Sequence, residues 1–404
     1  MKLLIFTQHY WPEVFRINDV AAALVEAGVD TAVLTGKPNY PVGSILPGYR
    51  AWGTLRESYQ GVTIHRVPLL PRGRATSLRL AANYLSFIVS AAVLGPWLLR
   101  RQRFDAILVY ATSPLLQALA AVVLKWCTRS ALVIWVQDLW PESLSATGHV
   151  RSPHVLGLVR YVVRWIYRRC ELILVPSQAF VGRVQPLAGG TPVAFQPNPA
   201  ERPRARSMDD PFSSMITPGA FTVVFAGNLG TAQALDTVLA AAERLRNHSA
   251  IRFLLVGSGS RAHWVEVETR RLGLTNVTLA GQHPPEAMPA LFARASALLV
   301  SLADHDILAL TIPSKIPTYL AAGRPVIASL NGEGARVIAE SGAGVCSPAS
   351  DADALAAAVE DLSRRPSDDL DAMGRRGREY FQRHFEPRHL TDQLLRHLQR
   401  AVAR

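Results

Sequence analysis

The chain has 404 residues, of which 49% are hydrophobic, and a formal net charge of +12 at pH 7. This length exceeds one ordinary hydrophobic core and predicts two folded domains of about 180 to 200 residues. The three cysteines, at 127, 170 and 346, match no metal or disulfide spacing, which indicates thiols in a reducing cytoplasm. The N-terminal apolar run is too short for a signal peptide, so we expect no export.

Apolar runs of strand type alternate with helical stretches along the chain. In the first half they are KLLIFTQ, DTAVLTG, VTIHRVP, AILVYAT, ALVIWVQD, LILVPS and PVAFQPN. In the second half they are TVVFAGN, IRFLLVGSG, VTLAGQ, ALLVSLA, PVIASL and AGVCSP. This alternation predicts an α/β protein with two parallel, doubly wound sheets.

The composition suggests where the domains begin and end. We expect a first domain over 1–199, a polar, proline-containing linker over 200–219 and a second domain over 220–375. The segment 376–404 has a charged helical pattern interrupted at Pro387. This composition is too polar for a core element, so we expect the segment to pack along a surface or at the domain junction.

Two stretches of the first half carry arginine without any acidic residue. Their arginines are at 66, 72, 74, 79, 100, 101 and 103, and at 151, 160, 164, 168 and 169. Such patches attract phosphate on anionic lipid, on nucleic acid or on a phosphorylated substrate. Because no aromatic-interleaved recognition module accompanies them, we predict no nucleic-acid partner.

The run Leu80–Leu99 has no charged residue and three possible interpretations. It could be a buried helix, a helix in the membrane interface or a transmembrane helix; its arginine flanks with Tyr84 and Trp97 suit the interface. The later stretch VLGLVRYVVRWIYRR has arginines every four residues beside Trp165, which indicates either a basic surface stripe or an ordinary solvated face.

Polar residues follow several strands, at the edge where doubly wound sheets bind ligands. Asp138 in QDLWPES suits a residue that positions a substrate hydroxyl or takes its proton, and the alternative is an N-cap of the next helix. GNLGTAQ, from Gly227, and VGSGS, around Gly257, either admit an anion close to the backbone or are ordinary turns. Asp304 and Asp306 lack a third ligand for a metal, which leaves a hydroxyl-binding or a solvated loop.

Lys315, in LTIPSKIPTYLAAGRPVIAS, is one of four lysines in the chain. Ser314 is predicted as the N-cap of a helix that ends at Gly323. A cation in the first turn of a helix faces the positive end of its dipole, which favours a bound anion there; the alternative is a lysine that reaches out to water.

Five segments together resemble glycosyltransferase family 4, and more closely its WbuB-like branch of bacterial surface-polysaccharide enzymes. They are HYWPEVFRINDVAAALVEAGVDTAVLTGKPNYPVG, FDAILVYATSPL, WVQDLWPES, GNLGTAQ and IPSKIPTYLAAGRPVIA, which span nearly the whole chain. The resemblance implies the GT-B fold, in which two Rossmann-like domains face each other and the C-terminal one holds a nucleotide sugar. It also implies metal-independent transfer with retention of anomeric configuration and no cofactor.

The chain departs from the family pattern at four positions. Leu310 and Thr318 stand where two donor-binding glutamates are usual, and Asn228 and Gln233 stand where an Arg and a Lys usually hold the diphosphate. We therefore expect Lys315 to supply the missing positive charge.

These considerations assign each candidate residue a role. The expected catalytic residue is Asp138. The donor-binding candidates are Gly227, Asn228, Gly230, Gln233, Gly257, Gln282, His283, Ser314, Lys315 and Thr318. The candidates for binding the sugar or the acceptor are Arg16, Asn18, Asp304 and Asp306. Arg16 is also a candidate for binding a phosphate. Asp304 or Asp306 could replace the missing sugar-binding glutamate.

The resulting prediction is a transferase that moves a sugar, such as N-acetylfucosamine, from UDP to a polyprenyl-diphosphate-linked glycan. We expect it in the cytoplasm, bound peripherally to the anionic inner face of the cytoplasmic membrane. The alternatives are a UDP-sugar epimerase of the same fold and a degenerate, non-catalytic assembly factor.

Overall fold

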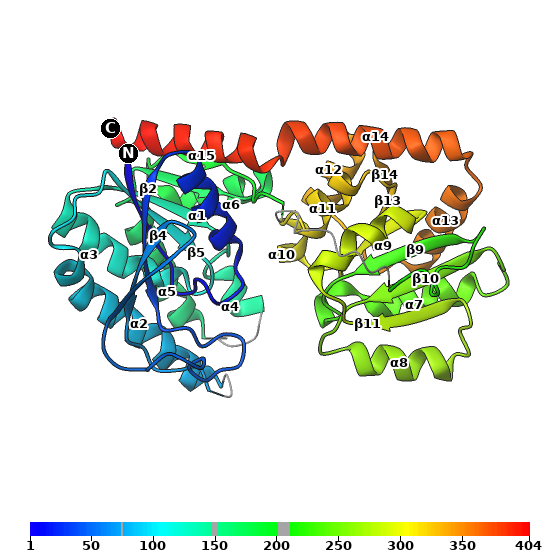
Figure 1. Ribbon diagram of the computed structural model, residues 1–404, viewed down its shortest axis with the longest axis horizontal. Helices are drawn as coiled ribbons and strands as arrows, with labels where there is room; N and C mark the ends of the chain where they lie inside the picture. Colours follow the sequence, from blue (N-terminus) through cyan, green and yellow to red (C-terminus); the bar gives the residue numbers. More distant parts are fainter. Residues whose placement is uncertain (74–75, 147–151, 201–210) are drawn as a thin grey trace. The chain divides into compact units, whose positions relative to one another are not determined.

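The computed structural model describes residues 1–73, 76–146, 152–200 and 211–404. The chain forms two compact units (Figure 1). Unit 1 comprises Met1–Pro199 and Pro387–Arg404, and unit 2 comprises Ala200–Glu386. Each unit is built on its own sheet with helices between the strands, so the predicted α/β class with two doubly wound sheets is confirmed.

Unit 1 contains an eight-stranded sheet in the order β3-β4-β2-β1-β5-β6-β7-β8. Its strands are β1 (Lys2–Phe6), β2 (Asp30–Gly36), β3 (Leu55–Tyr59), β4 (Val62–Val67), β5 (Ala106–Ala111), β6 (Ala131–Val136), β7 (Leu172–Val175) and β8 (Val193–Phe195). All neighbours run parallel except β3, which pairs antiparallel with β4 at the edge. Strand β3 was not predicted, because LRESY is polar and mostly exposed.

The helices of unit 1 cover both faces of this sheet. They are α1 (Arg16–Glu26), α2 (Ser77–Leu99), the 3-10 helix η1 (Leu115–Gln117), α3 (Ala118–Thr128), α4 (Glu142–Ala146), α5 (Pro153–Tyr167), α6 (Gln178–Ala188) and α15 (Pro387–Val402). Figure 1 shows α15, in red, running beside α1. On the other face α2 contacts α3 and α3 contacts α5. These helices connect β4 to β5, β5 to β6 and β6 to β7, and right-handed crossovers that proceed in one direction along the sheet place their helices on the same face.

The C-terminal segment is divided between the two units. The helix α14 (Ser367–His384) belongs to unit 2, whereas α15 returns to unit 1. Along α15 the side chains of Leu390, Leu394 and Leu398 are buried, and the last two join the core beneath α1. The expectation that this segment is too polar to be a core element is therefore wrong for α15, because one apolar stripe suffices to dock a polar helix.

Arg66 is not part of a basic surface. Its side chain is fully buried, forms an ion pair with Glu57 of β3 and donates to the carbonyls of Trp11 and Gly36. This arginine therefore ties β3 and the loop after β1 to β4. Of the other predicted patch residues, Arg74 and Arg151 lie outside the described residues.

Unit 2 contains a fully parallel six-stranded sheet in the order β11-β10-β9-β12-β13-β14. Its strands are β9 (Phe221–Ala226), β10 (Ile251–Val256), β11 (Val277–Gly281), β12 (Ala297–Ser301), β13 (Val326–Ser329) and β14 (Gly344–Ser347). Besides α14 its helices are η2 (Thr231–Gln233), α7 (Leu235–Arg244), α8 (Ala262–Arg271), η3 (Pro285–Ala287), α9 (Met288–Arg294), α10 (Asp306–Ala309), α11 (Lys315–Ala322), α12 (Glu333–Ser341) and α13 (Ala352–Ser363).

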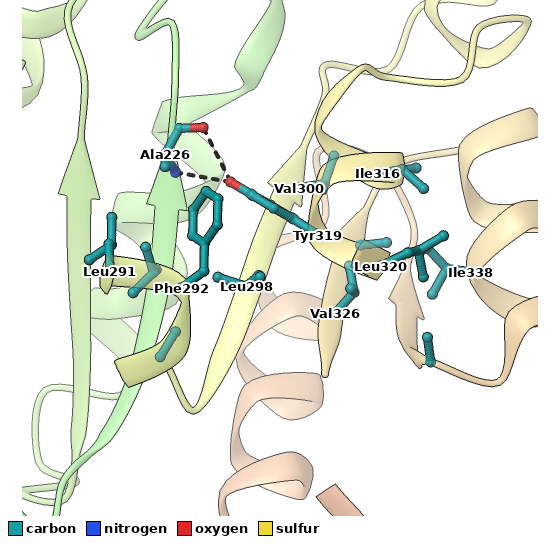
Figure 2. Close-up of a cluster of buried hydrophobic side chains, with 14 of the residues drawn as sticks. Ala226, Leu291, Phe292, Leu298, Val300, Ile316, Tyr319, Leu320, Val326 and Ile338 are labelled. Atoms are coloured by element: carbon teal, nitrogen blue, oxygen red, sulfur yellow. Dashed lines mark hydrogen bonds between the residues drawn. The ribbon is translucent and has the colours of Figure 1, made fainter. Parts of the chain in front are cut away.

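Alternate side chains of the unit 2 strands enter two separate cores, one on each face of the sheet. Val224 and Ala226 of β9 point into the core that includes α9 and α11, which Figure 2 shows in part. Val223 and Phe225 point into the other core. Phe212, which the sequence analysis placed in the linker, is completely buried in the first core. Residues 201–210 of that predicted linker lie outside the described residues.

Candidate active site

Two glycine-rich turns lie against each other at the carboxyl ends of β9 and β10. The backbone N–H of Gly227 donates to Val256 at 2.8 Å, and that of Leu229 donates to Ser258 at 2.8 Å. A Cβ on Gly257 would lie 1.8 Å from the carbonyl oxygen of Gly227, so no larger residue fits. Both glycines have positive φ, +134° and +141°. The two predicted glycine positions are thus adjacent.

The loop that follows Gly227 is held by its own side chains. The backbone N–H of Gly230 donates to Oε1 of Gln233 at 3.1 Å, and a Cβ on Gly230 would lie 2.7 Å from Nδ2 of Asn228. A single 3-10 turn, η2, follows, and α7 begins at Leu235. The helix α7 thus begins directly after GNLGTAQ, as expected, and η2 forms the last three residues of that motif.

Lys315 extends from the first turn of α11 to the Gly227 turn. Its Nζ lies 3.2 Å from the ring centroid of Phe225, and a Cβ on Gly227 would come within 2.8 Å of its Cε. The residue as a whole is partly exposed, but Nζ itself is buried and has no hydrogen-bond partner among the described residues. Burial lowers the pKa of Lys315 to about 7, because no nearby acid compensates the lost hydration of the ammonium.

Tyr319 fixes α11 to the end of β9. Its hydroxyl donates to the carbonyl of Ala226 at 3.2 Å and accepts from the backbone N–H of the same residue at 3.1 Å (Figure 2). Phe292 packs edge-on against the tyrosine ring. Because Tyr319 lies one helical turn after Lys315, this contact holds the lysine beside Gly227. The sequence analysis missed Tyr319, although its four-residue spacing from the lysine was visible.

The neighbours of Lys315 on α11 are close but have different roles. Ser314 occupies the N-cap position with helical φ and ψ and makes no side-chain capping bond, so the prediction of a serine cap is wrong in its detail. The hydroxyl of Thr318 donates back to the carbonyl of Ser314 at 3.3 Å. The predicted helix end at Gly323 is confirmed, with φ of +68°.

Two further donor candidates lie after β11. Gln282 is exposed, and its Oε1 accepts from the hydroxyl of Ser258 in the second glycine turn at 3.1 Å. His283 packs against Phe212, and its Nε2 lies 3.0 Å from the carbonyl oxygen of Ala280. Gln282 therefore lies at the glycine turns, whereas the His283 ring is engaged by the core below.

Asp304 and Asp306 follow β12 and are both exposed. Oδ1 of Asp304 accepts from Nδ2 of Asn331 at 3.0 Å, and Asp306 opens α10. The N–H of Ala303 donates to Ala232 at 2.9 Å, which joins this loop to the first glycine turn. Within the described ranges no group of three or more His, Cys, Asp or Glu side chains could hold a metal ion.

In unit 1, Asp138 lies beyond the carboxyl end of β6. Its Oδ1 accepts from the hydroxyl of Ser143 at 3.1 Å. Burial raises the pKa of Asp138, while hydrogen bonds from Ser143 and Ser113 act in the opposite direction. A half-buried carboxyl held by two hydroxyls at a strand end suits a group that accepts a proton or a hydrogen bond from a substrate hydroxyl.

Arg16 and Asn18 both lie in the first turn of α1. Arg16 is therefore a helix residue and not a loop residue, and its guanidinium donates to the carbonyl of Pro199. The amide of Asn18 accepts from the N–H of Trp11 at 3.2 Å and donates to the carbonyl of Glu13 at 2.8 Å. Both polar ends of Asn18 thus hold the loop between β1 and α1.

A buried His9 and Glu13 pair organises this edge of unit 1 and was not among the predicted residues. His9 Nδ1 lies 3.0 Å from Oε2 of Glu13, and both side chains are almost fully buried. The other carboxylate oxygen of Glu13 accepts the N–H groups of Asn39 and Tyr40, at 2.8 and 2.7 Å. The spacing of His9 and Glu13 in HYWPE was visible, but their pairing depends on the loop that follows β2.

The solved structures that the chain resembles identify the class. The chain aligns with sucrose-phosphate synthase from Thermosynechococcus elongatus with a TM-score of 0.72 and 17% identity, covering 100% of this chain and 99% of that one. It aligns with HepE of Anabaena in complex with UDP with a TM-score of 0.71 and 14% identity, covering 99% and 100%. The protein thus has the GT-B fold of nucleotide-sugar-dependent glycosyltransferases.

The family models identify the chain further. Residues 14–199 match the model "Glycosyl transferase 4-like domain", and residues 220–365 match "Glycosyl transferases group 1". The chain belongs to glycosyltransferase family 4, as its motifs predicted, and is a glycosyltransferase.

Two curated bacterial proteins are similar over most of their length. The putative colanic acid biosynthesis glycosyl transferase WcaI of Escherichia coli K12 is 24% identical over 337 residues, which cover 80% of this chain and 82% of WcaI. The probable glycosyltransferase WbjE of Pseudomonas aeruginosa is 24% identical over 312 residues, which cover 74% of this chain and 76% of WbjE.

Proposed function

We propose that this glycosyltransferase moves a sugar from a UDP-sugar to a polyprenyl-diphosphate-linked glycan during assembly of a bacterial surface polysaccharide such as O-antigen, capsule or exopolysaccharide. WcaI is named for colanic acid biosynthesis, and HepE has been solved in complex with UDP and with UDP-glucose. The observation that carries the proposal is Lys315, whose buried and unpartnered Nζ lies beside the Gly227 turn at the end of β9.

The donor diphosphate would bind where α11 meets the glycine turns. The absence of a Cβ at Gly227 and Gly257 lets the two turns and the Lys315 side chain pack closely together, and Lys315 supplies a positive charge there. Asn228 and Gln233 stand in place of charged residues, so Lys315 would be the main cation for the leaving group. Gln282, Ser314 and Thr318 remain proposed donor contacts at the same edge.

The acceptor hydroxyl would be oriented by Asp138 in unit 1. The bond between the anomeric carbon and the phosphate oxygen breaks while the acceptor oxygen forms a bond on the same face of the sugar. The acceptor proton passes to the departing phosphate, and the Asp138 carboxylate accepts a hydrogen bond from the hydroxyl as it attacks. We propose that the reaction proceeds with retention and without metal, because charged side chains and backbone N–H groups take the role of a cation.

We further propose that the sugar is an N-acetylated 6-deoxyhexose such as N-acetylfucosamine and that Asp304 or Asp306 contacts it. Both aspartates are exposed at the edge that carries the glycine turns. The enzyme would act as a peripheral protein at the inner face of the cytoplasmic membrane, where a lipid-linked acceptor is located.

Isothermal titration calorimetry in the presence of a chelator tests the donor site. We expect one UDP-sugar to bind and Lys315→Met to weaken it by about tenfold to a hundredfold, the size of a hydrogen bond to a charged group. Arg270→Met, which removes an exposed cation from unit 2, is the matched control and should leave binding unchanged. Equal binding by wild type and Lys315→Met would contradict the role of the lysine.

The same experiment distinguishes the two alternatives. An epimerase would convert its UDP-sugar without any acceptor, which nuclear magnetic resonance of the sugar would show directly. Absence of binding by every nucleotide sugar at millimolar concentration would favour a degenerate assembly factor, for which the replacement of the usual glutamates by Leu310 and Thr318 already argues.

A further inference from the structure

The helices α2, α3 and α5 form one layer over a single face of the unit 1 sheet, and none of them contains an acidic residue. In the sequence the two acid-free stretches are separate, since α2 ends at Leu99 and α5 begins at Pro153. The fold brings them together through α3, so the three helices form one acid-free layer and not two local runs.

After its first turn, which exposes Ser77 and Arg79, the outward side of α2 is apolar. Five large side chains, each between 56% and 81% exposed, recur at helical spacing along it: Leu78, Leu85, Val89, Val93 and Trp97. By length and composition α2 is, within the described part of the chain, the one helix that could cross a membrane. An exposed apolar stripe of this size on a soluble protein indicates a binding surface.

The inward side of α2 is part of the folded core. This excludes one of the three interpretations of the helix, the transmembrane one. Asn83, Phe87, Ala91, Gly95 and Leu99 are all buried against the unit. The amide of Asn83 accepts from Gln8 at 2.7 Å, and a Cβ on Gly95 would touch the side chains of Leu34 and Leu124 at about 3 Å. Because the inward side of α2 is locked into unit 1, this helix can lie on a membrane but cannot span one without unfolding the unit.

Tryptophan and arginine mark the carboxyl ends of all three helices. Arg100 lies over the ring of Trp97 at the end of α2, with its guanidinium 4.6 Å from the centroid. Arg169 lies 3.5 Å over Trp165 at the end of α5, and Trp165 in turn meets the 58% exposed Trp126 of α3. Tryptophan and arginine are the residues that anchor proteins at the headgroup level of a bilayer.

The helix α5 adds a second amphipathic stripe. Val155, Leu158 and Tyr161 are 45%, 63% and 67% exposed, beside the exposed Arg160 and Arg164. Trp126 also lines a cavity of about 420 Å³ whose charged lining consists of Lys125, Arg129, Glu171 and Arg404, an excess of positive charge. Apolar stripes bordered by cations complement a bilayer that carries anionic lipids.

We infer that the layer of α2, α3 and α5 is the membrane-docking face of this enzyme and binds an anionic lipid bilayer with α2 lying in the interface plane. A helix of 23 residues laid flat would span about 34 Å of bilayer surface. This inference rests on the proposed function in one respect: an enzyme that uses a lipid-linked acceptor needs a surface that binds the membrane.

Vesicle flotation without any substrate tests this inference. The wild-type chain should float with vesicles of phosphatidylcholine and phosphatidylglycerol, and less with rising salt or without phosphatidylglycerol. Val89→Glu/Val93→Glu should reduce the bound fraction by about tenfold or more, because two carboxylates would enter the interface. Both sites are exposed, so folding is not disturbed. Val267→Glu, at an exposed valine of unit 2, is the matched control and should float like wild type.

Three results would overturn the inference. One is equal flotation of the double variant and wild type, and another is a wild type that does not float. The third is a wild-type dimer that the double variant converts to monomer without any effect of vesicles, since a second copy would then cover α2. UDP-sugar binding measured on the same variant separates these outcomes from failure of the proposed function, because loss of flotation with intact donor binding concerns this face alone.

Discussion

At the residue scale, burial shifts the pKa values of two proposed site residues, Lys315 and Asp138. Each is an ionisable group at the carboxyl end of a sheet, and burial disfavours its charged form. The buried Nζ of Lys315 lies over the face of Phe225, where a protonated amine gains a cation–π contact but lacks a counter-ion. A bound diphosphate would supply that counter-ion.

The affinity for a UDP-sugar should therefore fall as the pH rises above about 7. Burial lowers the pKa of Lys315 to about 7, and a bound diphosphate raises it again by stabilising the ammonium. Binding is then strongest below pH 7 and weakens by up to about tenfold per pH unit above it, until the pH exceeds the pKa of the complex. Calorimetry between about pH 6 and 9 measures this dependence.

Lys315→Met provides the control for the pH dependence. The other titratable groups that directly follow β11 and β12 are His283, Asp304, His305 and Asp306, and all four remain in the variant. A flat profile in the variant would assign the dependence to the lysine. A profile that keeps the wild-type slope would exclude it.

Asp138→Asn should slow sugar transfer by about a hundredfold and leave UDP-sugar affinity unchanged. The amide keeps the shape of the carboxylate but lacks the negative charge that strengthens the hydrogen bond from the attacking hydroxyl. Initial rates with a short-chain lipid acceptor, together with calorimetry, measure both quantities. Asp105→Asn, at the opposite edge of the same sheet, is the matched control. A variant that loses donor affinity in proportion to rate would contradict an acceptor-side role.

At the element scale, α11 shows how a short helix can place a functional side chain. Its end at Gly323 and the strand that follows are as predicted, but its start is not capped by Ser314. The position of the helix is instead set by the tyrosine contact to Ala226. The Tyr319 side chain reaches the end of β9 and so fixes the position of α11 along the sheet. Such a contact between distant residues cannot be recognised in the local sequence.

Tyr319→Phe should loosen α11 from β9. The loss of the two hydrogen bonds to Ala226 should cost about 1–3 kcal/mol, because buried backbone groups would be left without a partner. We expect faster hydrogen exchange at residues 226 and 315–322 and a several-fold weaker UDP-sugar affinity. Tyr161→Phe removes an exposed hydroxyl and should change neither quantity. Unchanged exchange in Tyr319→Phe would show that core packing alone holds the helix.

At the scale of the whole molecule, the chain folds as two units, and its last helix returns to the first of them. The N-terminal unit is therefore incomplete without α15, which comes from the far end of the sequence. Leu398 is fully buried in the core that also contains Leu3 and Ile5 of β1. Folding of unit 1 thus depends on residues that follow unit 2 in the sequence.

Leu398→Ala should destabilise unit 1 by about 2–5 kcal/mol, the range for a leucine removed from a packed core. Seven of the eight tryptophans belong to unit 1, with Trp264 the exception, so urea unfolding followed by tryptophan fluorescence reports mainly on this unit. Val402→Ala on the same helix removes a 43% exposed side chain and should have a small effect. Similar midpoints for both variants would mean that α15 is dispensable for unit 1.

The sequence predicted much of the fold because its parallel strands are almost uniformly apolar. A strand that is buried on both faces needs such a run, so KLLIFTQ and IRFLLVGSG are recognisable without context. The exposed strand β3 and the 3-10 turn η2 were missed because neither is defined by a hydrophobic period. The glycine positions were also predictable, since a turn with positive φ favours that residue.

By itself, the sequence determined the α/β class, the family and the candidate residues at the strand ends, because these depend on local pattern and residue type. Only the tertiary structure decided that Lys315 lies unpartnered beside Gly227, that Glu13 binds the loop after β2 and that Arg66 is buried. It also decided that the helices of two acid-free stretches form one layer. The physical reason is that burial, pairing and continuity of a surface arise from contacts between residues far apart in the chain, which local pattern does not encode.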